Sequence, residues 1–253
     1  MTHVNSSQPA MQNQRRSPLY RRHTELKAEF ESLGDASLVS RYGELAAEIE
    51  SAAQLGLADL SALPRIGFKG AGAPQWAISQ GIKLPESPNH SVVQDDGALV
   101  GKLSHQELLI LSDLAGSSAL VNSLEPVQIE SLEPVQIESL KQSEPAAQTY
   151  HLPRAHSHSC LAVTGTAAAE MFSKVCGVDL RSHKFAQGQI AQTSLAKINA
   201  VIVRHDLAET PCFYVLSDIS TVEFLWDCLL DAMQEYAGVP VGVAALRSLA
   251  ARG

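Results

Sequence analysis

Cysteine is scarce in this chain of 253 residues. The four cysteines all lie in the second half, and none lies close to another in sequence. This wide spacing excludes the closely paired cysteines of zinc sites and redox motifs. We therefore expect reduced, buried thiols that act as small apolar side chains, as is usual in a reducing compartment, and a cytoplasmic location. The cysteines are Cys160, Cys176, Cys212 and Cys228.

Basic residues are also in the minority. The chain has 19 Lys and Arg against 27 Asp and Glu, which gives a formal net charge of -8 at pH 7. Binding of nucleic acid depends on clustered basic side chains that displace counterions from phosphates. No such cluster follows the opening segment, so the composition argues against nucleic acid as a partner.

A long apolar run is missing as well. No stretch approaches the roughly 18 consecutive apolar residues that cross a bilayer, so we expect no membrane partner. Residues 1–14 are polar and lack the apolar centre of a secretory signal, which predicts a disordered leader. The chain is nevertheless 45% hydrophobic. That content is ample for a buried core in one large domain or in two packed halves.

Apolar periodicity and turn residues in residues 15–122 predict a first α+β half. Gly70 and Gly72 supply a turn, and Pro74 is suited to the first position of the helix that follows it. The predicted elements are a short basic helix within 15–30, an amphipathic helix at 37–60, a strand at 60–68, a helix from Pro74, and an antiparallel pair of strands at 97–103 and 108–113.

Residues 123–149 contain the octapeptide Ser-Leu-Glu-Pro-Val-Gln-Ile-Glu twice in succession, at 123–130 and 131–138. Two copies are too few for a repeat architecture. The prolines and glutamates oppose both a helix interior and a central strand. We interpret the segment as a duplicated, exposed insertion that joins two halves.

Residues 150–240 predict a second α+β half with the same order of strand, glycine and helix as the first. The fold class is therefore α+β, with two related halves that share one core. Residues 241–253 form a C-terminal tail in this scheme. The predicted elements of the second half are a strand at 159–164, a turn at Gly165, a helix at 167–176, a strand at 192–204, a strand at 212–216, and a helix at 220–236 capped by Ser220.

Four groups of residues could carry chemistry, and for each a structural role is favoured. His156, His158 and Cys160 would share one face of a strand, but a structural zinc site needs a fourth ligand that the sequence does not place. Asp95 and Asp96 could assist amine chemistry, yet a following glycine makes an ordinary turn. Cys176 falls late in a predicted helix, where the dipole disfavours a thiolate nucleophile. Gly165 lacks the neighbours of a phosphate loop and suits a strand-to-helix turn.

Polar side chains on the apolar strand at 192–204 require partners, because an unpaired polar group in a core costs about 1–3 kcal/mol. They bond within the chain or face a subunit interface. On the last helix, Trp226 belongs to the core stripe, whereas two other aromatic residues are better placed as interface anchors. The candidate interface residues are Gln192, Thr193, Lys197, Asn199, Arg204, Phe224 and Tyr236.

Several stretches resemble known proteins. Residues 157–165, 176–181, 185–204 and 224–226 resemble the gamma subunit family of the heterotetrameric sarcosine oxidases, and this similarity extends over roughly residues 155–245. Upstream, Arg16-Ser-Pro-Leu-Tyr-Arg-Arg-His23 and Leu55-Gly-Leu-Ala-Asp-Leu-Ser61 resemble the glycine-cleavage T-protein and other aminomethyltransferases. The resemblance implies the T-protein-like folate-binding fold, which consists of two related α+β halves. The leader and the octapeptide insertion depart from a typical gamma subunit.

The resemblance also implies a role. It suggests a non-catalytic subunit without a cofactor of its own, whose alpha, beta and delta-type partners carry FAD, FMN and NAD. Those partners oxidise sarcosine and pass the one-carbon unit to tetrahydrofolate. An alternative is a free-standing folate-binding or aminomethyltransferase-like protein, which would need a complete folate site. A folate-dependent iron–sulfur maintenance protein is a third candidate, but its Lys-Gly-Cys-Tyr type motif corresponds here to Lys184-Phe-Ala-Gln-Gly-Gln189.

Overall fold

A computed structural model describes residues 15–124 and 148–253 of the chain. The leader at 1–14 and most of the octapeptide insertion, residues 125–147, therefore lie outside the described residues. Among the helices of the described part, none is long and apolar enough to cross a membrane.

Twelve elements lie within the described residues 15–124, before most of the insertion. They are β1 (Arg15–Arg16), α1 (Tyr20–Glu25), β2 (Glu29–Leu33), β3 (Ala36–Arg41), α2 (Leu45–Leu55), β4 (Gly56–Asp59), β5 (Arg65–Lys69), α3 (Ala73–Ser79), β6 (His90–Val93), β7 (Leu99–Ser104), β8 (Glu107–Leu111) and α4 (Ala119–Leu124). The elements after it are β9 (Tyr150–Leu152), α6 (Arg154–Ser157), β10 (His158–Thr164), α7 (Ala168–Phe172), β11 (Ile190–Leu195), β12 (Ile198–Arg204), β13 (Cys212–Asp218), η2 (Ile219–Thr221), α8 (Val222–Met233), η3 (Gln234–Tyr236), β14 (Val239–Pro240) and α9 (Val243–Ala250).

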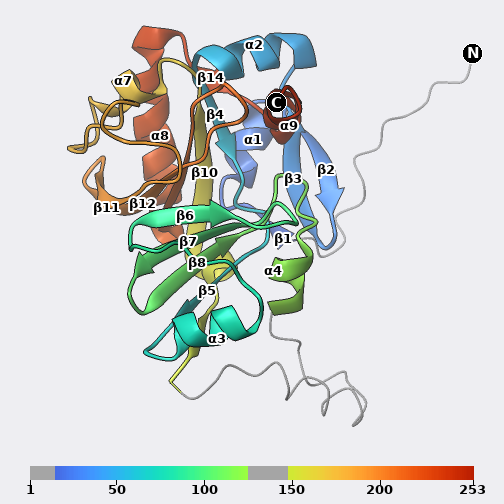
Figure 1. Cartoon of the computed structure of the whole chain (residues 1–253). Helices are drawn as coiled ribbons and strands as arrows, with labels where there is room; N and C mark the ends of the chain where they lie inside the picture. The colour runs from blue at the N-terminus through green and yellow to red at the C-terminus, as the bar shows by residue number, and fades with distance from the viewer. Residues whose placement is uncertain (1–14, 125–147) are drawn as a thin grey trace, which may run out of the picture.

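The main body consists of two sheets with helices on their outer faces (Figure 1). The six-stranded sheet has the order β11-β12-β13-β10-β4-β14, and the five-stranded sheet has the order β6-β7-β8-β5-β9. One apolar cluster lies between the two sheets, a second lies between the six-stranded sheet and α7 and α8, and a third lies under α3 and α4. A small third sheet, β1-β3-β2, packs with α2 and α9 at one end of the body.

The two halves exchange a strand. The segment from β4 to α4 has the order of two strands, a helix, a three-stranded meander and a helix, and the segment from β9 to α8 has the same order apart from the short helix α6 between its first two strands and η2 before its last helix. However, β4 pairs with β10 of the second segment, while β9 pairs with β5 of the first. The prediction of an α+β fold with two related halves is confirmed. Because each sheet needs a strand from the other segment, the halves share one folding unit.

Several local predictions are confirmed. The strands predicted at 97–103 and 108–113 are the antiparallel pair β7 and β8, and the strand predicted at 159–164 is β10. Pro74 lies in the first turn of α3. Gly70 and Gly165 both have positive φ, +127° and +110°, directly after β5 and β10. The predicted order of strand, glycine and helix is therefore confirmed in both halves.

The predicted helix at 37–60 is wrong at both ends. Residues 36–41 form strand β3, the helix α2 is limited to 45–55, and residues 56–59 form strand β4. All four residues of β4 are buried in the middle of a sheet, so their apolar run continues the apolar pattern of α2. Periodicity cannot separate a fully buried strand from the end of a buried helix. The predicted basic helix at 15–30 likewise contains only α1, between β1 and β2.

The strand predicted at 192–204 is also wrong, because this segment is a hairpin. Strands β11 and β12 pair in antiparallel fashion from Ile190 with Val203 to Leu195 with Ile198. The two residues of the turn, Ala196 and Lys197, both have positive φ, 49° and 67°. Asparagine and glycine usually occupy such a turn. Their absence here hid the turn from sequence reasoning.

The last part of the chain differs from prediction in three places. The helix predicted at 167–176 ends at Phe172. The predicted N-cap Ser220 is replaced in this role by Asp218, whose carboxylate accepts from the backbone N–H of Ser220 at the start of η2. The segment designated as a C-terminal tail contains α9, which packs against α2 and β3.

We expect that replacing Ala237 with glycine stabilises the protein. Ala237 is exposed and ends η3 in the left-handed conformation, with φ of 54°. A residue with a Cβ costs about 1–2 kcal/mol there, against about 0.5–1 kcal/mol of extra chain entropy for glycine. The Ala237→Gly variant should therefore gain up to about 1.5 kcal/mol, measured by urea denaturation. A clear loss of stability would contradict a left-handed Ala237.

Candidate functional site

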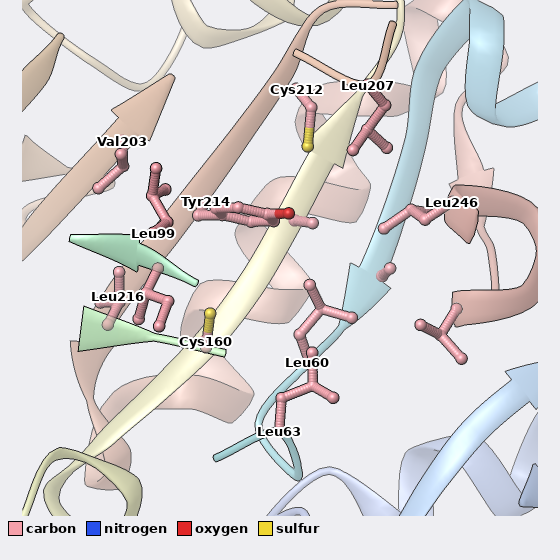
Figure 2. Packing of buried hydrophobic residues seen from close by; sticks show 14 of the residues in the cluster. Leu60, Leu63, Leu99, Cys160, Val203, Leu207, Cys212, Tyr214, Leu216 and Leu246 are labelled. Carbon is pink, nitrogen blue, oxygen red and sulfur yellow. The ribbon is translucent and has the colours of Figure 1, made fainter. Parts of the chain in front are cut away.

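The interior between the two sheets is filled by side chains (Figure 2). The Tyr214 ring lies in this interior among leucines from both sheets, and Cys160 and Cys212 lie on the same sheet face. The cavity left beside Tyr214 and Cys160 has a volume of about 10 Å³. That volume holds about one water molecule, whereas small-molecule sites occupy about 300–1,000 Å³. Among the described residues, this cavity is therefore too small for a folate-sized ligand.

Two side chains with potentially reactive groups border this cavity, and the environment of each keeps it unreactive. Burial raises the pKa of the Cys160 thiol to about 11, so the thiol stays protonated at neutral pH. Arg65 is 2% exposed, and its guanidinium donates to the backbone carbonyls of Ser61, Leu63, Ala155 and His158. The Nε atom of Arg65 has no hydrogen-bond partner among the described residues, and burial lowers the pKa of the guanidinium. Arg65 thus ties the first segment to the start of β10 through carbonyl oxygens.

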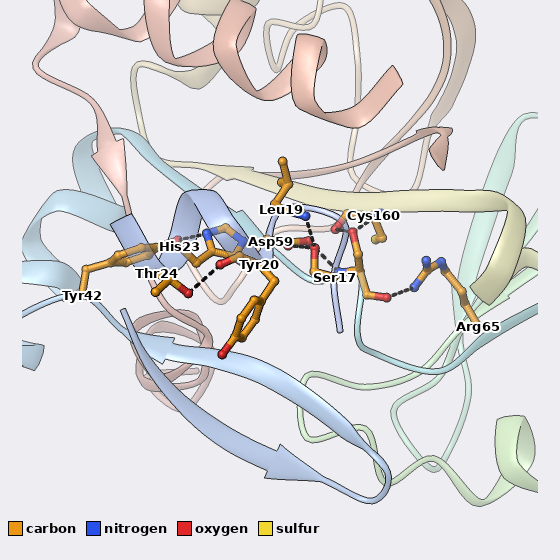
Figure 3. A network of polar contacts seen from close by, with 10 residues as sticks. Ser17, Leu19, Tyr20, His23, Thr24, Tyr42, Asp59, Arg65 and Cys160 are labelled. Atoms are coloured by element: carbon orange, nitrogen blue, oxygen red, sulfur yellow. Dashed lines mark hydrogen bonds and ion pairs between the residues drawn. The ribbon is translucent and has the colours of Figure 1, made fainter. Parts of the chain in front are cut away.

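A buried polar network joins the two stretches that resemble aminomethyltransferases (Figure 3). The Asp59 carboxylate lies 2.8 Å from His23 Nε2 and accepts from the Ser17 hydroxyl and, at 2.9 Å, from the Ser61 N–H. On the other side of the imidazole, His23 Nδ1 lies 2.8 Å from the Tyr42 hydroxyl. Sequence reasoning quoted these stretches separately and did not place them together.

The network is a structural contact rather than a reactive site. Burial alone would raise the pKa of Asp59, but the hydrogen bonds from His23, Ser17 and Ser61 and the charge of His23 outweigh it and lower the pKa. The His23 and Asp59 side chains are 0% and 1% exposed. No substrate reaches groups that are so fully enclosed. The network therefore holds the N-terminal segment against β4.

The two carboxylates considered for amine chemistry lie in a turn, as predicted. Asp95 is an exposed residue whose carboxylate pairs with Lys83 at 2.5 Å. Asp96 accepts from the Ser118 hydroxyl at 2.7 Å and from the Leu120 N–H at 2.9 Å, at the start of α4. Gly97 has φ of +85°, as a tight turn requires.

The three residues considered for a metal do not share a strand face. His156 lies in helix α6, whereas His158 and Cys160 lie in β10. His158 Nε2 is 3.0 Å from an Arg154 guanidinium nitrogen, and His158 Nδ1 is 2.8 Å from the Ser157 hydroxyl. Within residues 15–124 and 148–253, no group of three or more His, Cys, Asp and Glu is arranged to hold a metal ion.

His158 predicts a pH dependence of stability. Burial and the neighbouring Arg154 and Arg65 lower its pKa, against the opposing charges of Asp218 and Glu107. The unfolded chain therefore binds a proton at His158 more readily than the folded chain does. As a result, the free energy of unfolding decreases as the pH falls below about 6.5, the ordinary pKa of histidine, towards the lower pKa of His158 in the folded chain. We expect His158→Gln to lose less stability than wild type between pH 7 and pH 5 in urea denaturation. Equal losses would show that His158 does not contribute.

The candidate interface residues gather around hairpin β11–β12. Gln192, Thr193 and Asn199 line a groove of about 490 Å³ on one side, together with His158. Lys197 and Phe224 line a groove of about 630 Å³ on the other side. Gln192 also donates to Asn89 Oδ1 at 2.8 Å and to the Leu103 carbonyl at 2.7 Å. The polar residues at 192–199 thus belong to a partly exposed edge hairpin rather than to a buried central strand.

The other two candidate interface residues have partners within the chain. Arg204 is 8% exposed, pairs with Asp206 through two nitrogens at 3.0 and 2.8 Å, and donates to the Phe185 carbonyl at 2.5 Å. Tyr236 packs partly against the core, with Lys174 over its ring at 5.9 Å. Cys176 is 8% exposed and lies in the turn after α7, where it pairs with Leu195 of the hairpin. An interface role for all seven candidate residues stays a prediction.

No protein-family model and no curated protein matches the chain. Several solved structures, including the following two, are similar in fold. A chain of the heterotetrameric sarcosine oxidase from Corynebacterium sp. U-96, in complex with pyrrole 2-carboxylate, is 22% identical, with a TM-score of 0.56 over 76% of this chain and 92% of that one. Glycine cleavage system aminomethyltransferase T from Bartonella henselae is 18% identical, with a TM-score of 0.65 over 93% of this chain.

The chain has the aminomethyltransferase T fold. The predicted T-protein-like fold is thereby confirmed, because both neighbours share it with this chain. The chain spans only 62% of the length of the Bartonella henselae aminomethyltransferase T chain. At these identities, the T-protein-like fold is what the similarity establishes, and function is a separate question.

Proposed function

We propose that this chain is a non-catalytic, gamma-type subunit of a sarcosine oxidase complex. In this proposal, it packs against a larger subunit of the same fold, and the alpha, beta and delta-type partners bind FAD, FMN, NAD and tetrahydrofolate. The complex oxidises sarcosine to glycine, forms peroxide and transfers the one-carbon unit to tetrahydrofolate. This chain carries no catalytic residue and works in the cytoplasm.

The closed interior is the observation that carries the proposal. Ligand sites favour interfaces between halves, and the cavity beside Tyr214 and Cys160 at that interface has a volume of about 10 Å³ within the described residues. A free-standing folate protein would need a far larger space there. In contrast, larger grooves lie on the outside, beside hairpin β11–β12. The similarity to a chain of a heterotetrameric enzyme, over 92% of that chain, supports the same reading.

The test is purification of the tagged, full-length chain from its native cell. We expect larger, flavin-containing chains to co-purify, identified by mass spectrometry and by their ultraviolet–visible spectrum. Sarcosine should then drive peroxide formation by the eluate.

The alternative is a free-standing folate-binding or aminomethyltransferase-like protein, favoured by the TM-score of 0.65 over 93% of the chain. In that case, the chain elutes alone and colourless, and binds tetrahydrofolate in calorimetry. This result would overturn the subunit proposal. It would also require the interior around Tyr214 to open, since the folded interior is filled.

A further inference from the structure

The outer face of helix α8 leaves an apolar side chain uncovered. Val222, Trp226 and Leu229 of this helix face the core and are at most 1% exposed, whereas Phe224 is 55% exposed. Phe224, Cys228 and Asp231 follow at helical spacing on a second stripe beside the core stripe. A ring that is more than half exposed loses favourable burial unless a partner covers it.

This stripe forms one wall of the 630 Å³ groove, which we call the α8 groove. The residues that define the groove are Val175, Gly177, Ala196, Lys197, Phe224 and Cys228. The groove is open at Gly177, because a Cβ added there would meet no atom within 4 Å. Its lining combines apolar residues of α8 and of the turn after α7 with the polar residues Ser173, Lys174 and Asp231, and the tip of hairpin β11–β12 lies at its edge.

The charges of the groove indicate what it accepts. Lys174 is already engaged, donating to the Ala232 carbonyl at 3.0 Å and pairing with Glu235 at 3.0 Å. Lys197 is exposed at the hairpin tip and makes no ion pair within the described residues. Asp231 on α8 disfavours a carboxylate against that wall. An incoming acidic group therefore fits at Lys197, and an apolar group fits against Phe224 and Cys228.

We propose that the α8 groove docks a segment of the larger subunit in which a carboxylate side chain lies close to an apolar one. This inference rests on the proposed subunit function and names its interface. The apolar side chain covers Phe224, which is the kind of aromatic anchor that dominates binding energy. The carboxylate pairs with Lys197, which contributes orientation and selectivity.

Gly177 allows the groove to be blocked without disturbing the fold. In Gly177→Gln, the new side chain adds bulk at the wall of the groove, and its Cβ meets no described atom within 4 Å. Gly43→Gln is the matched control, since Gly43 is exposed, distant in sequence and equally free of neighbours within 4 Å of a Cβ. We expect Gly177→Gln to lower the amount of larger subunit that co-purifies with the tagged chain at least 10-fold. Gly43→Gln should match wild type, and both variants should keep the circular dichroism spectrum and Tm of wild type.

A zero-length carbodiimide cross-linker tests the charge pairing in the purified wild-type complex. It should join Lys197 Nζ to an Asp or Glu of the larger subunit, in a peptide with a neighbouring apolar residue. If the larger subunit co-purifies but Gly177→Gln retains it, or if Lys197 is joined only to a second copy of this chain, the docking site is wrong while the subunit function stands. If wild type elutes without a larger subunit, both are overturned.

Discussion

Replacing Asp59 with alanine should lower the free energy of unfolding by about 3–5 kcal/mol, which is the usual cost of removing one partner of a buried charged pair. The Asp59 carboxylate accepts hydrogen bonds from Ser17 and Ser61 and contacts the His23 imidazole, all inside the protein. Without it, three polar groups lose their acceptor while remaining shielded from water. Because small domains are stable by only about 5–15 kcal/mol, the effect should be plain in urea denaturation.

Asp95→Ala is the matched control for this prediction. Its carboxylate pairs with Lys83 at the surface, where both side chains are more than half exposed, 90% and 54%. Exposed ion pairs contribute about 0–1 kcal/mol, so this variant should stay within that range of wild type. A loss below about 1 kcal/mol in Asp59→Ala would mean that the buried network does not anchor the N-terminal segment.

Replacing Gly165 with alanine should cost about 2–6 kcal/mol. Gly165 has φ of +110°, and a Cβ there would lie 2.4 Å from the backbone carbonyl carbon and oxygen of Gln54. A side chain in such a sparsely populated conformation costs about 1–3 kcal/mol, and forcing atoms into a packed site costs about 1–3 kcal/mol more. The contact is with backbone, which cannot rotate away. We expect little soluble, folded protein and a strongly reduced urea midpoint for any that is recovered.

Gly177→Ala provides the comparison, because its new methyl group would meet open space and its φ is not positive. This variant should differ from wild type by less than about 1 kcal/mol. If Gly165→Ala were as stable as Gly177→Ala, then α2 and the turn after β10 could not be packed as closely as the structure has them.

Prediction from sequence worked where a local rule and the tertiary structure agree. Strand β10, the turn at Gly165 and the hairpin β7–β8 carry clear turn and strand signals, and all three were found. It failed at β4, where burial on both faces removes the alternation that marks a strand. It also failed at Ala196 and Lys197, where the tertiary contacts of the hairpin hold two residues in a conformation that neither prefers.

Predictions about the candidate sites likewise succeeded where a local pattern was sufficient and failed where distant segments meet. The aromatic spacing on the last helix was enough to separate Trp226, which is 1% exposed, from Phe224, which is 55% exposed. The α8 groove itself was not predictable, because Val175, Lys197 and Phe224 come from three segments that meet only in the folded chain. Arg204 was grouped with the interface residues as a polar side chain on a strand predicted to be buried, and its partner, Asp206, lies beyond the end of that strand.

By itself, the sequence determined the fold class, the two related halves and the strand–glycine–helix units, because these depend on local periodicity and on residues that only certain turns accept. The tertiary structure alone decided the exchange of β4 and β9, the buried contact between His23 and Asp59, and the filled interior around Tyr214. Each of these depends on which distant segments pack together. Such packing is set by the shape and burial of the whole chain, which no local pattern contains.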